Sequence, residues 1–515
     1  MLLEAWPRLR ATIAAFILCL GVAGPMFAQN SVGTSFGYAL QESGNNICSL
    51  NFTESGNTNI IQPPLFASYN RDNPQWWYNL VEEAAFANMF YLAMNFRGDS
   101  PCGVFPPNGN EPTMYASYLR DALTTRGYTG ILKIALFDDT GAYPGHVQAC
   151  GDGATFDFSK TSLRDKYVWN TKWKPFFDQV PSTHRMKINN RPLVFMWSVD
   201  PGLGFSNHGN GNLRLLIEYL RAQCKARPGD SFDPFIIVDQ SWLQYDPTVA
   251  SQVDGVNNWF TPPTGWSKRS HTGYSGTFTT GIIVPGFYYD RSQPNPNMFI
   301  DRLAGSTLKT SLQNVAGSNT VLIEGITDLE ENAGLYRGSP TAYPACSMGD
   351  ERPANQQWSY PNQYLNIMRE AISPSQKYFV YEAEAADAYS SINSASSTLY
   401  RRAGSLYIVY ANPTQSQWAV RLKASDNLRF VSSKLGASSN YKLGVRYAAA
   451  APATVRLWID SSLKRTVTLP ATGGTSVYTQ FNDSVLFSAV ATPHTVKLEV
   501  TSGELYVDNW TLNGN

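Results

Sequence analysis

The apolar run Leu132-Lys-Ile-Ala-Leu-Phe137 is followed at once by the acidic pair Asp138-Asp139, and this short strand with its polar end decides the fold. From Pro64 to about Ser375, similar runs rich in β-branched and aromatic residues alternate with longer helical stretches. Such alternation is the signature of parallel βα units. The region therefore predicts an α/β domain built on a parallel sheet.

Eight candidate strands lie in this region, and eight is the number that a (β/α)8 barrel of the TIM type requires. Their ranges are 65–69, 89–95, 132–137, 192–197, 235–238, 255–259, 281–287 and 320–326. Helical patterns fall between them at 76–86, 115–126, 163–179, 212–226 and 297–315, with a last one at 361–372. The barrel is the expectation, and a doubly wound sheet built from the same units is the alternative.

The composition changes at Ser373-Pro374-Ser375, and no helical period follows. Short alternating runs separated by turn residues continue to the end of the chain, which is typical of an all-β sandwich. The expected domains are an export signal at 1–28, an irregular arm at 29–63, the barrel at 64–377 and the sandwich at 378–515.

The first residues have the pattern of an export signal. Arg8 and Arg10 precede an apolar stretch at 11–22, and the following pattern Pro25-Met-Phe-Ala28 places cleavage after Ala28. No later stretch approaches the roughly 20 apolar residues that a membrane crossing needs. The mature protein is therefore expected to be soluble, and secreted or periplasmic.

Charge and aromatic content indicate a neutral partner. The 40 basic residues balance the 40 acidic ones and only 16% of residues are charged, so no field attracts nucleic acid or an anionic membrane. Aromatic residues make up 13% of the chain, and sugars favour aromatic platforms flanked by fixed polar groups. Large secreted proteins also carry many aromatic residues, which is the alternative reason. We expect a polysaccharide or oligosaccharide partner and a monomeric protein.

Five cysteines remain after cleavage, enough for one or two disulfides in an oxidising compartment with one thiol left over. They are Cys48, Cys102, Cys150, Cys224 and Cys346. Neither they nor the five histidines have the spacing of a zinc site.

The segment 321–332 is the densest in acidic residues. Glu324 and Asp328 follow an apolar run, and Glu330 and Glu331 come directly after them. Crowded carboxyl groups raise the pKa of at least one of their number, which is how a carboxylic acid becomes a general acid near neutral pH. Glycoside hydrolysis needs such a pair. The alternative is an ordinary helix start, where acidic residues are also favoured.

A family resemblance rests on the same segment. Ile323-Glu-Gly-Ile-Thr-Asp328-Leu-Glu-Glu331-Asn resembles the final-strand motif of barrels related to glycoside hydrolase families 71 and 99. The segments 285–290 and 191–197 resemble earlier strand ends of those barrels, so the likeness covers most of 64–372. It implies that Asp328 and Glu331 are the two catalytic acids, with Glu331 the proton donor. Position 328 is Asp where the family has Glu.

Polar and aromatic residues at the other predicted strand ends are candidates for substrate binding, because a barrel presents its functional groups there. They are Asp138, Asp139, Trp197, Asp239, Trp242, Trp259, Tyr289 and Asp290. Asp138 and Asp139 orient sugar hydroxyls or supply a second catalytic carboxylate; alternatively they cap a loop or bind calcium. His146 and His208 lie in Gly-rich loops and either face the site or are solvent-exposed.

Two C-terminal segments carry a second resemblance. Tyr381-Glu382-Ala-Glu384-Ala and Tyr506-Val-Asp508-Asn-Trp510 are similar to the first and last strands of carbohydrate-binding modules of families 6 and 35. The likeness implies a jelly-roll, galactose-binding-like sandwich whose Glu382, Glu384 and Asp508 hold a structural calcium. The alternative is that these three are solvated charges at strand ends. Trp418 and Tyr506 either stack on sugar or belong to the core.

The leading hypothesis is a secreted glycoside hydrolase that cleaves O-glycosidic bonds in a polysaccharide. In this hypothesis Glu331 is the general acid/base, and Asp328 or Glu324 is its partner. The second hypothesis is a polysaccharide-binding protein whose barrel has lost its chemistry, which the Asp at position 328 favours.

Overall fold

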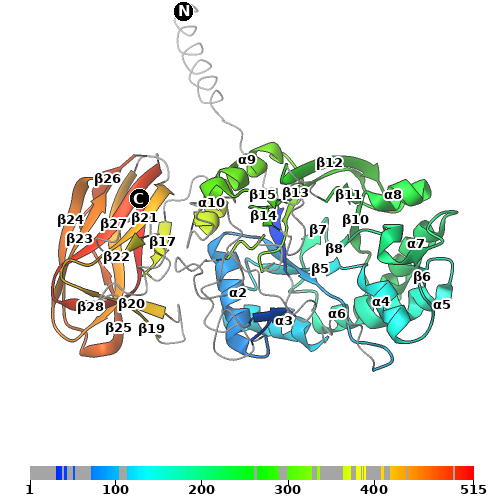
Figure 1. The fold of residues 1–515 in the computed structure, drawn as a ribbon, viewed down its shortest axis with the longest axis horizontal. Coiled ribbons are helices and arrows are strands. Elements are labelled where there is room, and N and C mark those ends of the chain that lie inside the picture. Colours follow the sequence, from blue (N-terminus) through cyan, green and yellow to red (C-terminus); the bar gives the residue numbers. More distant parts are fainter. Residues whose placement is uncertain are drawn as a thin grey trace, which may run out of the picture.

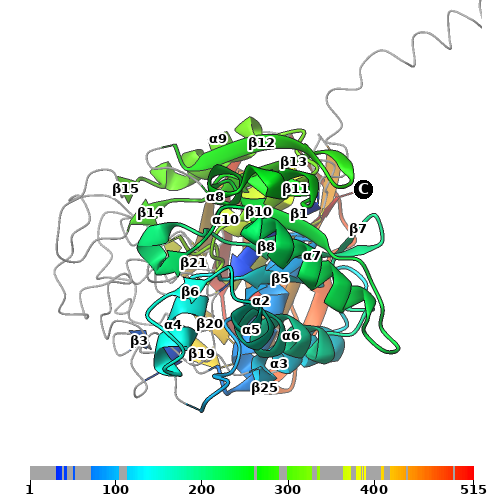
Figure 2. The same ribbon diagram turned by 90° about the vertical axis from the view of Figure 1, so that its right-hand side faces the viewer.

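The computed structural model describes two parts of the chain, a barrel and a sandwich (Figure 1). The described residues are 31–36, 40–42, 50–52, 71–103, 113–259, 264–288, 299–327, 333–336, 363–372, 378–383, 386, 388–389, 407–410, 418–435, 439–490 and 493–514. The sandwich, coloured yellow to red, lies on the opposite side of the barrel from α4, α5 and α7 (Figures 1 and 2).

Eight parallel strands form the barrel, and they follow one another around it in chain order. They are β1 (Ser31–Phe36), β4 (Tyr91–Asn95), β5 (Lys133–Asp138), β8 (Arg191–Met196), β10 (Phe235–Asp239), β11 (Gly255–Asn257), β13 (Gly276–Ile283) and β16 (Thr320–Ile323). This order confirms the TIM-like barrel over the doubly wound alternative.

The barrel is nearly closed. Its ladder runs from β11 through β10, β8, β5, β4, β1 and β16 to β13, whose other edge pairs with β12 (Trp266–Gly273), and no pairing joins β11 to β12 or β13 in the described residues. β11 and β13 still approach closely, because a Cβ atom at Gly255 would lie 3.3 Å from side-chain atoms of both Phe278 and Thr280. Glycine therefore lets the seam between β11 and β13 close. Beside this seam, β12 forms an antiparallel hairpin with β13.

The first barrel strand is a correction to the sequence prediction. Residues 31–36 were expected in an irregular arm, but as β1 they pair with both β4 and β16. Their burial follows from a central position between two parallel neighbours, although Gly, Ser and Thr hide the strand character of the segment. The segment 65–69, expected as the first strand, lies outside the described residues.

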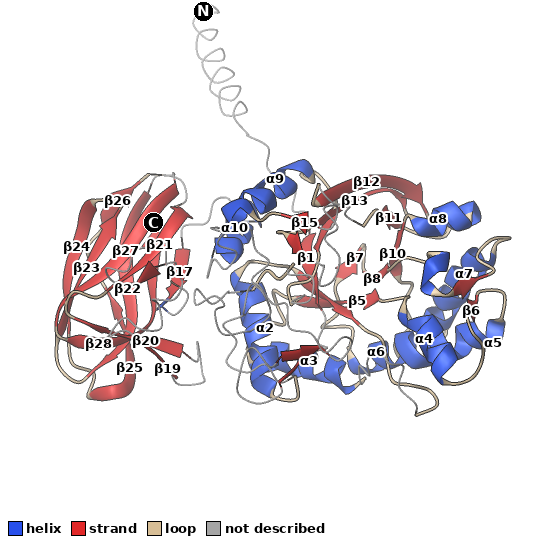
Figure 3. Cartoon of the chain, in the orientation of Figure 1, coloured by secondary structure: helices blue, strands red, loops and turns tan. Residues whose placement is uncertain are grey.

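Helices surround the barrel, and the described part of the sandwich consists of strands with no α-helix (Figure 3). The helices are α2 (Pro74–Phe86), α3 (Met114–Thr125), α4 (Ala142–Ala149), α5 (Thr161–Leu163), a π-helix (Arg164–Trp173), α6 (Lys174–Gln179), α7 (Asn212–Lys225), α8 (Ser241–Tyr245), α9 (Ser306–Asn314) and α10 (Gln363–Ile372). Short 3-10 turns lie at Pro201–Leu203, Pro247–Ser251 and Leu303–Gly305. None of the described helices is long and apolar enough to cross a membrane.

Four small pairings complete this part. β7 (Lys187–Ile188) pairs with β8, β2 (Leu40–Glu42) with β3 (Leu50–Phe52), β6 (Phe156–Asp157) with β9 (Phe205–Ser206), and β14 (Phe287–Tyr288) with β15 (Phe299–Ile300).

Two antiparallel sheets make up the sandwich. The seven-stranded sheet contains β17 (Tyr378–Glu382), β19 (Tyr407–Tyr410), β20 (Trp418–Lys423), β22 (Ser439–Ala449), β25 (Gly474–Asn482), β26 (Phe487–Ala489) and β28 (Glu504–Gly514). The five-stranded sheet contains β18 (Ala388–Tyr389), β21 (Asn427–Lys434), β23 (Ala453–Ile459), β24 (Ser462–Leu469) and β27 (Pro493–Ser502). Their facing side chains form one core of their own.

Alternation along the barrel strands separates two further cores. On β4, Tyr91 and Ala93 belong to a cluster inside the barrel, whereas Leu92 and Met94 belong to the cluster between the strands and the helices. The same alternation holds for β5 and β8. Because successive side chains of a strand point to opposite faces, it also fixes which residues at the strand ends face inward.

Candidate functional site

Inward-facing residues at the carboxyl ends of the barrel strands form a ring that we call the inner rim. Every second residue of a barrel strand faces the interior, and each rim residue continues this alternation. Asp139, for example, follows the inward residues Ala135 and Phe137, and Glu324 follows Leu322. Trp259 follows the end of β11 and packs against the same inner cluster. The inner rim consists of Ser35, Asn95, Asp139, Trp197, Asp239, Asn257, Trp259 and Glu324. Barrel enzymes place their functional groups at this end.

The order of the strands determines which rim residues face each other. Three strands separate β4 from β11 on either side, so Asn95 lies across the barrel from Asn257. By the same reasoning, Trp197 on β8 lies across from Glu324 on β16. The rim therefore has an amide pair along one diameter, and an indole and a carboxyl group along another.

Asp139 faces inward with its charge compensated. Arg97 Nε donates to Asp139 Oδ2 at 2.9 Å, and the Gly141 amide donates to Oδ1 at 3.1 Å. Burial opposes ionisation of this carboxyl, but the attraction of Arg97 and Lys172 outweighs it and holds the pKa of Asp139 below its usual value. Asp139 is thus an ionised, positioned acceptor and not a proton donor near neutral pH.

Asp138 is a correction, because it points away from the rim. It is fully buried and accepts from Lys172 Nζ at 3.0 Å, from Trp173 Nε1 at 2.8 Å and from the Tyr143 hydroxyl. Lys172 is also fully buried, and its ammonium group additionally donates to the Asp139 carbonyl. The parity of β5 turns Asp138 toward the helices, so it holds the strand end in place and does not contact substrate.

Asp239 fixes two loops at the rim. Its Oδ1 accepts from the Ser241 amide at 2.9 Å and its Oδ2 from the Trp259 amide at 3.3 Å. The carboxylate ties the end of β10 to the residue that follows β11. The substrate-binding prediction for Asp239 and Trp259 is thus compatible with their places on the rim.

The two tryptophans predicted from neighbouring strand ends differ in role. Trp197 is partly exposed on the rim, and a Cβ atom at Gly141 would lie 3.1 Å from its ring, so glycine makes room for the indole. Trp242 is fully buried and donates from Nε1 to the Trp197 carbonyl at 2.7 Å. Trp242 is therefore a core residue that fixes Trp197, which corrects its expected place beside the substrate.

Glu324 ends β16 and is 5% exposed. Its amide donates to the Ile283 carbonyl at 2.9 Å, and the next amide, of Gly325, donates to Ser35 Oγ at 2.9 Å. Gly325 has a positive φ of 60°, which turns the chain away from the strand direction directly after Glu324. The predicted catalytic residues Asp328 and Glu331 lie outside the described residues, as do Tyr289 and Asp290.

Ser35, Asn95 and Asn257 are the rim residues that the sequence prediction did not single out as site residues, and two of them are amides. Asn257 is 2% exposed, and Asn95 is partly exposed with a buried Oδ1. The Oδ1 atom of each has no hydrogen-bond partner in the described part of the chain. The alternation of side chains along each strand could have identified them, because every second residue after a known inward residue also faces the barrel interior.

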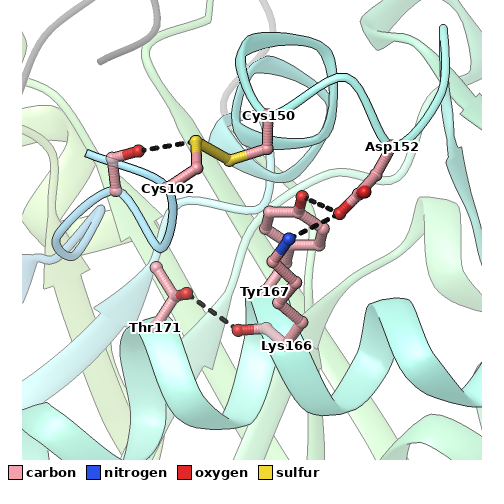
Figure 4. The surroundings of a disulfide bond; sticks show 7 residues. Cys102, Cys150, Asp152, Lys166, Tyr167 and Thr171 are labelled. Carbon is pink, nitrogen blue, oxygen red and sulfur yellow. Dashed lines mark hydrogen bonds and ion pairs between the residues drawn. A yellow bond between two sulfur atoms is a disulfide. The ribbon is translucent and has the colours of Figure 1, made fainter. Parts of the chain in front are cut away.

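A disulfide supports the loop that carries Arg97. Cys102 bonds to Cys150 at the end of α4, with Tyr167, Asp152 and Lys166 beside it (Figure 4). This pairing falls within the expected one or two disulfides, and Cys224 is a buried free thiol. Cys48 and Cys346 lie outside the described residues.

His146 lies behind Arg97 and is not a solvent-exposed loop residue, since it is 1% exposed on α4. Its Nε2 lies 3.1 Å from the Arg97 carbonyl. Burial, together with the nearby cations Lys172 and Arg97, lowers the pKa of His146 to about 4. His208 is half-buried against Phe158 and Tyr245, and burial lowers its pKa as well.

Two of the candidate calcium ligands of the sandwich, Glu382 and Asp508, lie on β17 and β28. Arg446 pairs with Asn509 and Tyr447 with Val507, so Asp508 is the extra residue of a β-bulge. Asp508 is 1% exposed, and Arg446 Nε donates to its Oδ2 at 2.6 Å. Glu382 pairs in register with Asn509, and Glu384 lies outside the described residues. Among the side chains that the structure describes, no group of three His, Cys, Asp or Glu could hold a metal ion.

Two family models match the chain. The model described as "Domain of unknown function (DUF5010)" matches residues 28–388, and that of the carbohydrate binding module (family 35) matches residues 402–512. The first match includes all eight barrel strands, with β1 among them. No curated protein matches the chain.

Solved structures resemble the two parts separately. The GH99 endo-alpha-mannosidase from Bacteroides thetaiotaomicron is 13% identical, with a TM-score of 0.41, and the match covers 67% of this chain and 97% of that one. A carbohydrate-binding module of Cellvibrio mixtus lichenase 5A, in complex with cellotriose, is 15% identical with a TM-score of 0.22, covering 27% and 97%. A family 6 module from Clostridium cellulolyticum, in complex with xylose, is 18% identical with a TM-score of 0.22, covering 27% and 98%.

Proposed function

The chain belongs to the DUF5010 family, and from that premise we propose that it is a secreted glycoside hydrolase that cleaves O-glycosidic bonds in a polysaccharide. The barrel supplies the chemistry, and the sandwich, which matches a carbohydrate-binding module, holds the polymer. Export rests on the N-terminal sequence, in which Arg8 and Arg10 precede the apolar stretch at 11–22.

The observation that carries the proposal is the composition of the inner rim. Three carboxyl groups, those of Asp139, Asp239 and Glu324, and two indoles, those of Trp197 and Trp259, belong to one ring at the carboxyl ends of the strands. Carboxyl groups supply the acid, base and nucleophile of glycoside hydrolysis, and indole faces stack on sugar rings. Asp239 also ties two loops together, so the proposal depends on the combination of carboxyl groups with indoles in one ring.

In the proposed reaction, Glu331 donates a proton to the glycosidic oxygen as the bond to the sugar carbon breaks. The carboxylate of Asp328 or Glu324 acts on that carbon directly, or deprotonates the water that attacks it. Glu324 enters the chemistry from its place at the end of β16, seven residues before Glu331 in the sequence. Asp139 and Asp239 accept hydrogen bonds from hydroxyl groups of the bound sugar.

The test is Glu331→Gln against a panel of polysaccharides, with Glu330→Gln as the matched control one residue away. General acid/base catalysis contributes about 100-fold to 10,000-fold, so the first variant is expected to lose at least about 100-fold in turnover of any responsive glycan. The control is expected to stay close to wild type. Unchanged hydrolysis by Glu331→Gln would refute the assignment.

A second candidate function is polysaccharide binding without hydrolysis. It is favoured by Asp328, where the resembled barrels have Glu, and by the engagement of Asp138 with Lys172 and of Asp139 with Arg97. A glycan array on which the protein binds a polymer and releases no product from it, at any pH from 4 to 9, would support this candidate.

A further inference from the structure

Two inward amide residues stand at the carboxyl ends of strands on opposite sides of the barrel. Asn95 continues the inward parity of Tyr91 and Ala93 on β4, and Asn257 continues that of Gly255 on β11. These two strands lie on opposite sides of the ring, with three strands between them in either direction. Any molecule held along the barrel axis at this level lies between the two amides.

Both amides have an acceptor without a partner. The Oδ1 atoms of Asn95 and Asn257 are buried, and no described residue donates to either. Buried polar atoms in folded proteins are nearly always paired, because one left unpaired has lost its hydrogen bonds to water without replacement. Two such atoms at corresponding ends of opposite strands indicate a ligand with hydroxyl donors on two of its edges.

The surroundings of the amides indicate a ring-shaped ligand. Trp259, two residues beyond Asn257, has its ring centroid 5.7 Å from that of Phe137, and Asp239 holds its amide. The Trp197 carbonyl is held by the Trp242 indole. Two partly exposed indoles whose backbones are fixed offer stacking faces at little entropic cost.

The charge of the inner rim selects among sugars. The inner rim contains the carboxyl groups of Asp139, Asp239 and Glu324 and no basic residue of its own among the described residues, and Arg97 compensates the charge of Asp139. A uronate or sulfated sugar would therefore meet the carboxyl groups of Asp239 and Glu324 in a partly desolvated place, whereas a neutral sugar would meet acceptors for its hydroxyls.

We infer that Asn95 and Asn257 are specificity-determining residues that hold opposite edges of one neutral pyranose unit, and that the inner rim excludes anionic sugars. The inference rests on the proposed function, which places a sugar at the rim. It adds which residues select that sugar and that the selected sugar is neutral.

The experiment measures binding, so that it does not depend on turnover. Full-length protein carrying Glu331→Gln is applied to an array of neutral, uronate-containing and sulfated glycans, alone and with Asn95→Leu or Asn257→Leu added. The leucine replacements keep the side-chain volume and remove the hydrogen bonds. Each is expected to weaken the binding of neutral glycans about tenfold, because 1.4 kcal/mol, near the upper end for one neutral hydrogen bond, is a factor of ten.

Thr280→Val is the matched control. Thr280 is also inward-facing and buried, and its Oγ1 also has no partner in the described residues, but it lies at the level of Thr320, four residues before Glu324. Its replacement is expected to leave binding unchanged. The sandwich is the same in every variant, so any sugar bound there contributes a constant background.

Three results would overturn the inference: binding of anionic glycans that depends on the two asparagines, neutral binding that survives both leucine variants, or no binding that depends on either residue. The proposed function is tested by a different measurement, the hydrolysis of glycans. If the proposed function is wrong, Glu331→Gln and wild type will show the same hydrolysis, whatever the binding measurements show.

Discussion

Asp138 and Asp139 are neighbours in the chain with opposite surroundings, because a strand turns successive side chains to opposite faces. Asp138 is enclosed with Lys172 between the strands and the helices, and Asp139 reaches the rim beside Arg97. Asp138 holds the strand end against the helices, and Asp139 is the one of the two that belongs to the inner rim.

Replacement of Lys172 tests the buried pair. Lys172→Met leaves the carboxylate of Asp138 buried without its cation, which is expected to cost about 3 to 5 kcal/mol of barrel stability. Lys174→Met is the control, because Lys174 is 52% exposed in its pair with Asp178 and such pairs contribute less than about 1 kcal/mol. Denaturant unfolding of both variants measures the difference, and equal losses would contradict the structural role of Lys172.

His146 predicts how stability depends on pH. The pKa of His146 is 6.5 in the unfolded chain and about 4 in the folded protein. Between these two pH values the unfolded chain binds a proton that the folded protein does not. The free energy of unfolding therefore decreases as the pH falls from 6.5 to 4. At pH 5 the loss relative to neutral pH is about 2 kcal/mol. His146→Gln is expected to remove this part of the pH dependence. Denaturant unfolding at pH 7 and pH 5 checks it, and a variant whose stability falls as steeply as that of wild type would exclude His146 as the cause.

At the scale of elements, period and turn residues predicted the second to fifth barrel strands well, whereas β13 begins five residues before its expected start at 281. β4, β5, β8 and β10 are apolar runs bounded by polar residues, and the structure has them within two residues of the expected bounds at each end. β1 was missed because its Gly, Ser and Thr lack the apolar signature, and only pairing with β4 and β16 makes it a strand. Propensity cannot reveal such a strand, since its stability comes from neighbours distant in sequence.

The candidate site was predictable only in part, for a related reason. Strand ends are visible in the sequence, so Asp139, Trp197, Asp239 and Trp259 were found. The inward or outward sense of each end depends on a register that a one-residue error inverts, as for Asp138. Trp242 follows β10 on a helix, where its burial depends on the contacts of the assembled fold.

Calcium in the sandwich remains a proposal that β17 and β28 can test. If Glu382, Glu384 and Asp508 hold the ion, calcium at 100 times its Kd stabilises the sandwich by about 2.7 kcal/mol, and a chelator lowers its unfolding temperature. Asp508→Asn should abolish the difference between the two buffers. If Arg446 alone neutralises Asp508, calorimetry will give the same unfolding temperature in calcium and in chelator.

At the scale of the whole molecule, the barrel and the sandwich have separate hydrophobic cores. The residues of α10 belong to the outer core of the barrel, and the sandwich core begins at Tyr381. Each part therefore buries its apolar surface largely within itself, which is the physical basis of a domain. The break in the sequence at residues 373–375 lies between the two.

A chain ended at residue 377 tests this division of labour. Because the barrel keeps its own core, the shortened protein is expected to fold and to hydrolyse soluble oligosaccharides within about twofold of the full chain. Its activity on an insoluble polymer should fall about 10-fold to 100-fold, since tethering by a second site raises the effective concentration of substrate. Equal activity of both proteins on the insoluble polymer would contradict a polymer-holding sandwich.

The seam between β11 and β13 has a consequence for how the barrel moves. Backbone amides along an unpaired strand edge are released to solvent by small local openings, so they exchange their hydrogens sooner than amides in a continuous ladder. Asn257 and Trp259 belong to the strand that borders this seam and to the loop after it. Deuterium uptake should therefore begin at residues 255–259 and at β12, each of which has one edge unpaired in the described residues, and a bound glycan should slow it there before anywhere else in the barrel.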